Sequence, residues 1–122
     1  MHWGNKVKTP VDDFVTQLTS TSPVLSEIHR QHILEQGELL PHVLMGEIAR
    51  VVVANVGGAP AEWLDTLMRQ LEAGLVSGKD AVAELVAVSF VENLTGENTA
   101  IQALIPQMGV ALREEVKSIC GV

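Results

Sequence analysis

Three of the four histidines lie close together in the sequence, at His29, His32 and His42. Two histidines spaced by three residues on one face of a helix can bind one metal ion when a third ligand is near. By spacing, the residues that could supply this ligand are Glu35, Glu38, His42 and Glu47. No complete ligand motif of a zinc protease or a di-iron protein surrounds them. We therefore favour partly buried imidazoles, hydrogen-bonded to backbone carbonyls or a carboxylate, and keep a metal ion at His29, His32 and His42 as the alternative.

Three charged residues, Glu47, Arg50 and Glu92, interrupt segments that are otherwise almost entirely apolar. A charged group is tolerated in a protein interior only when it is paired and hydrogen-bonded. Paired carboxylates can also act as general acid and base. We expect instead a structural ion network around Arg50, or helix ends that reach solvent, because no substrate-pocket signature accompanies these residues. Together with the histidines they form the candidate polar site of the chain: His29, His32, His42, Glu47, Arg50 and Glu92.

Other reactive residues give no recognisable catalytic motif. The segment from Gly74 to Asp80 is one residue short of a phosphate-binding loop, and Asp80 stands where the magnesium-binding hydroxyl should be. Cys120 is the only cysteine, so the chain can form neither an internal disulfide nor a thiolate metal cluster. Ser89 belongs to no triad that spacing alone can identify. We predict no catalytic residues and no bound cofactor, and expect a protein that is not an enzyme.

The elements that position these residues are predicted to be helices. Three helices are predicted to begin with a proline at their first position, at Thr9-Pro10, Ser22-Pro23 and Ala59-Pro60. In the first two, Thr9 and Ser22 can also cap the helix. Stops are predicted at Gly37 and at Gly57-Gly58, where a glycine can take the left-handed conformation. Six helices follow, over about residues 10–18, 23–36, 41–56, 60–73, 80–94 and 98–119. Pro106 either kinks the last helix or starts a second one.

Two of these helices are apolar around their whole circumference, namely Leu39 to Val56 and Ala81 to Leu94. Helices of this kind lie at the centre of a protein. The chain is therefore predicted to be all-α, a single compact bundle of about six helices with two central apolar helices, over residues 9–122 after a flexible tail at 1–8. The core is expected to include Leu44, Ile48, Val52, Leu85, Val88 and Phe90.

The composition restricts the classes of partner. Eight Lys and Arg against 15 Asp and Glu give a net charge of -7, which repels nucleic acid and anionic lipid. Only two Trp and two Phe are available to stack on bases. We read no secretory signal in the sequence and no apolar run long enough to cross a membrane. We expect a cytoplasmic protein that binds no nucleic acid and no membrane, and whose partner is a protein, preferably a basic one.

Two segments, Gly37-Glu38-Leu39-Leu40-Pro41-His42-Val43-Leu44-Met45-Gly46-Glu47-Ile48 and Ala87-Val88-Ser89-Phe90-Val91-Glu92-Asn93-Leu94, resemble a family of small, uncharacterised bacterial all-helical proteins. The resemblance covers about residues 10–119. The family has no established catalytic residues that could be carried over to this chain, and its likeness to immunity-type proteins is one of size, acidity and helical content. We therefore expect a non-enzymatic protein-binding domain of a small acidic bacterial cytoplasmic protein, immunity or antitoxin-like. The alternative is a metal-binding protein or metal-dependent hydrolase that uses the His/Glu cluster.

Overall fold

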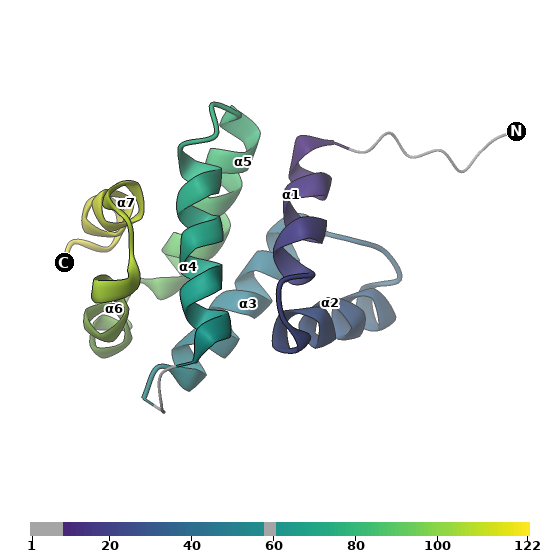
Figure 1. Cartoon of the computed structure of the whole chain (residues 1–122), viewed down its shortest axis with the longest axis horizontal. Coiled ribbons are helices and arrows are strands. Elements are labelled where there is room, and N and C mark those ends of the chain that lie inside the picture. Colours follow the sequence, from purple (N-terminus) through teal and green to yellow (C-terminus); the bar gives the residue numbers. More distant parts are fainter. Residues whose placement is uncertain (1–8, 58–60) are drawn as a thin grey trace, which may run out of the picture.

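A computed structural model describes residues 9–57 and 61–122, and these residues form helices and connecting turns without any strand (Figure 1). The predicted all-α class is therefore confirmed. Seven α-helices occur in the described ranges, where the sequence predicted about six: α1 (Pro10–Thr19), α2 (Pro23–Gln36), α3 (Pro41–Asn55), α4 (Glu62–Leu75), α5 (Asp80–Glu84), α6 (Asn98–Leu104) and α7 (Val110–Cys120). The predicted tail at 1–8 and the predicted start at Ala59-Pro60 lie outside the described residues.

The first two helices begin and end where local signals place them. Thr9 caps α1 through a capping box, in which its hydroxyl oxygen accepts the Asp12 amide at 3.0 Å. Ser22 caps α2 by accepting the Leu25 amide at 3.1 Å. Gly37 ends α2 with φ of 79°, a left-handed conformation that glycine adopts without a steric penalty. These caps fix the direction of the chain on both sides of α2.

Pro106 separates two helices, which resolves the two outcomes that the sequence allowed. A proline lacks the amide that a helix interior requires, and its ring collides with the preceding turn. The chain accordingly leaves α6 through a short 3₁₀ turn, η3 (Ile105–Gln107), and starts again as α7. This break accounts for the seventh helix.

The two apolar helices lie at the centre, as predicted. The second of them is a continuous helical stretch made of α5, a π-helical segment η1 (Leu85–Val91) and a 3₁₀ turn η2 (Glu92–Leu94). The most extensive packing in the molecule is between α3 and η1. Five of the six expected core residues are fully buried there: Leu44, Ile48, Val52, Leu85 and Phe90.

Val88 was expected in the core and is not, because 43% of it is exposed. Glu84 and Glu92 lie one turn before and after it, and both are exposed. These residues form an exposed side of the stretch from α5 to η2. This stretch is therefore less completely enclosed than its apolar sequence predicts.

The remaining helices surround this pair (Figure 1). Helix α4 packs against α5, which is the first part of the second central helix, and α6 and α7 lie to one side of these two. Helices α1 and α2 lie to the other side, and α2 packs against α3. No helix in the described part of the chain is both long and apolar enough to span a bilayer. The α2–α3 pair carries most of the predicted polar residues.

Candidate functional site

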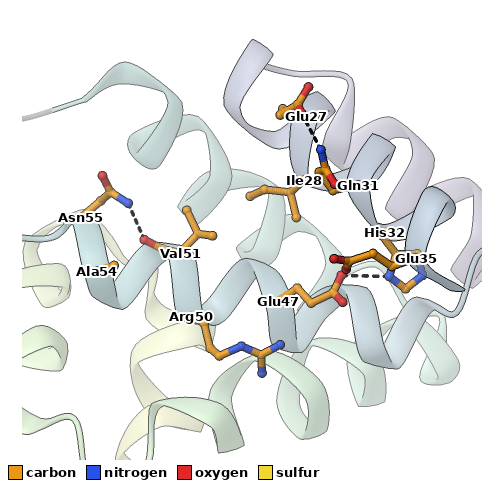
Figure 2. Close-up of a pocket in the computed structure, with 10 residues that line it drawn as sticks. All are labelled: Glu27, Ile28, Gln31, His32, Glu35, Glu47, Arg50, Val51, Ala54 and Asn55. Carbon is orange, nitrogen blue, oxygen red and sulfur yellow. Dashed lines mark hydrogen bonds and ion pairs between the residues drawn. The ribbon is translucent and has the colours of Figure 1, made fainter.

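A groove of about 470 Å³ runs between α2 and α3 (Figure 2). Its apolar floor consists of Ile28 from α2 with Val51 and Ala54 from α3. Its polar lining residues are Glu27, Gln31, His32, Glu35, Glu47, Arg50 and Asn55. Three of the six residues of the predicted polar site, His32, Glu47 and Arg50, therefore line one groove.

His32 is the most enclosed polar residue of the groove, with none of its surface exposed. Its Nδ1 lies 2.8 Å from Oε1 of Glu47 on α3, and its Nε2 accepts the backbone amide of Leu40 at 2.9 Å. Because Nε2 accepts, Nδ1 carries the proton and donates to the carboxylate. One imidazole thus joins α2 both to α3 and to the turn that connects the two helices.

These two contacts bear on the metal-binding alternative. A neutral imidazole can bind a metal only through an unprotonated nitrogen that is free. In His32 the unprotonated nitrogen already accepts the Leu40 amide. Within residues 9–57 and 61–122 no group of three or more histidine, cysteine, aspartate or glutamate side chains is arranged to hold a metal ion. His32 therefore acts here as a hydrogen-bonding link between helices.

Glu47 differs from His32 in that it reaches the groove. Its side chain is 19% exposed, and its second oxygen, Oε2, has no hydrogen bond to any described residue. Glu35 lies three residues after His32 on the same helix and is exposed. Figure 2 shows the carboxylates of Glu35 and Glu47 close to His32 at one end of the groove, and the guanidinium of Arg50 lies apart from both. Neither carboxylate has a lysine or arginine partner within the described structure.

Glu27, at the other end of the groove, is already paired. Arg30 donates two hydrogen bonds to its carboxylate, from Nε at 3.0 Å and from Nη2 at 2.6 Å, and Gln31 donates a third at 3.3 Å. The hydrogen bonds from Arg30 and then from Gln31 lower the pKa of Glu27 to about 2. Glu27 is therefore ionised but compensated, and the uncompensated negative charge of the groove is at Glu35 and Glu47.

The other predicted site residues form no hydrogen bond or ion pair with His32 or Glu47, although Arg50 lines the same groove. His29 is partly buried on α2, on the side of the helix that also carries the buried Leu25. Arg50 and Glu92 are both exposed, and neither forms an ion pair with another described residue. Both charges therefore lie on solvent-exposed helix surfaces, and Arg50 lies within α3, away from the ends of that helix.

His42 has a partner that sequence spacing did not identify. Its Nδ1 is hydrogen-bonded to Oγ of Ser89, which is 6% exposed and belongs to η1. The two residues are 47 positions apart in the sequence. Both lie in the two segments that carry the family resemblance, but only the packing of α3 on η1 shows that they meet.

One family model matches the chain, over residues 12–121, and its description is domain of unknown function (DUF7674). The chain belongs to this family. The family match includes both helices of the groove and the pair formed by His42 and Ser89. Comparison with curated proteins and with solved structures gives no match. The expected family of uncharacterised proteins is thereby confirmed, and its function has to be inferred from the geometry of the site.

Proposed function

We propose that this chain is a non-enzymatic protein-binding domain, and that the groove between α2 and α3 receives a basic segment of a partner protein. The observation that carries the proposal is the combination of an apolar floor with two uncompensated carboxylates, Glu35 and Glu47, at one end of the groove. Lysine and arginine have this same division, since each carries a charged head on an apolar stem. A basic side chain would lay its stem on Ile28, Val51 and Ala54 and direct its charge to the carboxylates.

The fixed position of Glu47 supports this proposal. Its Oε1 is held by the buried His32, so the side chain loses little additional conformational freedom when a ligand reaches Oε2. A hydrogen bond from an arginine to a carboxylate is stronger than one between neutral groups, and a bidentate pair also fixes orientation. The groove thus offers one preordered acceptor, from Glu47, and one adaptable acceptor, from the exposed Glu35.

The net charge of the whole chain also favours a basic partner. A net charge of -7 attracts a basic partner over a distance and increases the rate of encounter. An immunity or antitoxin-like role, in which this protein masks a basic toxin in the bacterial cytoplasm, fits that chemistry and is part of the proposal. Binding of a metal ion is the competing function, and no contact in the described residues favours it over the hydrogen-bonding role of His32.

The proposal is tested with a synthetic helical peptide that carries arginines along one face and leucines along the other, titrated by calorimetry at low salt. Glu35→Gln combined with Glu47→Gln keeps the size of both side chains and leaves an oxygen to accept from His32. We expect this double variant to bind about tenfold more weakly, which corresponds to two partly exposed ion pairs.

The matched control is Glu84→Gln combined with Glu114→Gln, which removes the same charge from two exposed positions outside the groove. It should weaken binding by about twofold at most, because only the distant field changes. An equal loss in both double variants would mean that the peptide responds to net charge and that the groove is not the binding site. Failure of the unmodified protein to bind the peptide would contradict the proposal directly.

A further inference from the structure

A second site lies on another part of α3, where His42 meets Ser89. We propose that Ser89 is a nucleophile activated by His42, and that it accepts an acyl group from small activated esters. This activity goes beyond the proposed binding function, since neither residue lines the α2–α3 groove. The contact itself is a serine hydroxyl and an imidazole nitrogen in direct hydrogen bonding, which is the arrangement that activates a serine.

The pair consists of one enclosed residue and one exposed residue. Ser89 is 6% exposed, whereas His42 is exposed at the second position of α3. His42 makes no other side-chain hydrogen bond to a described residue, so Nε2 can carry the ring proton. In that tautomer Nδ1 is the acceptor and the Ser89 hydroxyl donates to it. The imidazole can then take the proton as general base and exchange it with water.

Ser89 is held in place by its own helical stretch. The side-chain amide of Asn93 donates to the Ser89 carbonyl at 2.7 Å. Asn93 also packs against α3 at Gly46, where an added Cβ would lie 3.4 Å from its Nδ2. The surrounding segment, Leu85–Val91, is a π-helix, a rare conformation that is often found at functional sites. The nucleophile thus sits on an anchored backbone of unusual geometry.

The first turn of α3 adds donors close to the pair. Leu40 precedes this helix and provides no side-chain cap. The first amides of a helix have no partner within it, so the His42 and Val43 amides remain available as donors. They are suited to stabilise the negative charge that develops on an acyl oxygen.

The proposed step is an ordinary acyl transfer. Ser89 Oγ attacks the carbonyl carbon of the ester while its proton passes to Nδ1 of His42. The bond between the carbonyl carbon and the leaving oxygen then breaks, and that oxygen takes the proton from Nδ1. The products are an ester on Ser89 and a free alcohol or phenol. Because Ser89 is almost enclosed, only a small acyl group such as acetyl is expected to reach it.

The probe is p-nitrophenyl acetate, and the readout is the modified residue, located by peptide mass spectrometry together with release of p-nitrophenol. We expect acetylation of Ser89 in the folded protein and its loss in Ser89→Ala. His42→Ala should reduce the rate of acetylation at Ser89 by about a hundredfold, the usual contribution of a general base. Because His42 is exposed, this variant is expected to fold, which circular dichroism checks.

Added imidazole provides a readout that a purely structural role of His42 would not change. It should restore acetylation of Ser89 in His42→Ala, because free imidazole can occupy the space that the side chain leaves. His29→Ala is the matched control, and it should acetylate at the unmodified rate with no response to imidazole. Absence of acetylation at Ser89, or acetylation that His42→Ala leaves unchanged, would overturn the proposal. Acetylation only at other residues would overturn it as well.

Discussion

Two partly buried glutamates each join distant parts of this molecule, and they do so in opposite ways. Glu47 on α3 uses one oxygen to accept from His32, while the other oxygen faces the α2–α3 groove. Glu72 on α4 uses both oxygens, accepting the Leu112 amide at 2.8 Å and the Ala111 amide at 3.0 Å. The first carboxylate leaves an acceptor for a ligand, and the second leaves none.

The surroundings of Glu72 show why it is purely structural. Gly109 precedes α7 and cannot cap it with a side chain, so Glu72 supplies the missing cap from another helix. A Cβ on Gly109 would lie 2.4 Å from Cδ of Glu72, so the carboxylate fills the place of that side chain. Residue type and degree of burial therefore do not distinguish a binding carboxylate from a capping one. The two differ in how many of their oxygens already accept hydrogen bonds from the protein.

The largest effect is expected for Glu72→Ala. The change leaves the Ala111 and Leu112 amides without their charged acceptor at the start of α7, and each such bond contributes about 1.5 to 3 kcal/mol. Urea unfolding should show a loss of roughly 3 kcal/mol. Glu84→Gln, on an uncovered surface, is the control and should leave the midpoint nearly unchanged. A loss in Glu72→Ala as small as that of the control would mean that the cap contributes nothing to stability.

Gly109→Ala should be the next most destabilising change. The added methyl group displaces the Glu72 carboxylate from its two amides, and we expect a loss of about 2 kcal/mol. The backbone itself accepts alanine, since φ is -75° and ψ is 178°. The same change made in Glu72→Ala should therefore cost almost nothing. Equal costs in the two backgrounds, measured as a double-mutant cycle, would show that Gly109 is required for some other reason.

His32→Gln tests the other carboxylate link. Glutamine can replace one of the two hydrogen bonds but does not reach Glu47 and Leu40 together, and one unmatched buried group costs about 1 to 3 kcal/mol. We expect a loss of about 1.5 kcal/mol and no metal in either protein by elemental analysis. About one equivalent of zinc or iron in the unmodified protein, absent from the variant, would establish the metal-binding alternative instead. A chelator would then lower the melting temperature of the unmodified protein only.

Local signals predicted much of the fold because a helix cap depends on residues only a few positions apart. Thr9, Ser22 and Gly37 each act on their own turn, and each lies where the sequence placed it. The contact between Glu72 and α7 spans 39 and 40 residues, so no local pattern indicates it. The sequence also predicted an ordinary helix over Leu85–Val91, where the structure has a π-helix that packs against α3.

The candidate site was predictable to a similar degree. The position of His32 on the apolar face indicated a buried imidazole bonded to a carboxylate or a backbone carbonyl, but the sequence did not identify which carboxylate. Only the way α2 packs on α3 brings Glu47 to it. Arg50 and Glu92 lie on apolar helices but face solvent, because composition does not reveal which side of a helix its neighbours leave uncovered. The His42 and Ser89 contact depends on the same long-range packing.

The smallest effect is expected for Arg30→Ala, which concerns a third kind of carboxylate. Glu27 is held by exposed side chains alone, and both partners of its pair with Arg30 are more than half exposed. Its pKa of about 2 lies below the ordinary 4.5, so its contribution to stability is present above pH 4.5 and is lost as the pH falls towards 2. Removal of Arg30 should move the pKa of Glu27 back towards 4.5, which NMR titration of its carboxyl carbon would follow. Near neutral pH the urea midpoint should not change, because exposed pairs are screened by solvent. An unchanged pKa of Glu27 would show that Gln31 alone holds the carboxylate. A large loss of stability at neutral pH would instead show that this surface pair stabilises the fold as much as the Glu72 cap does.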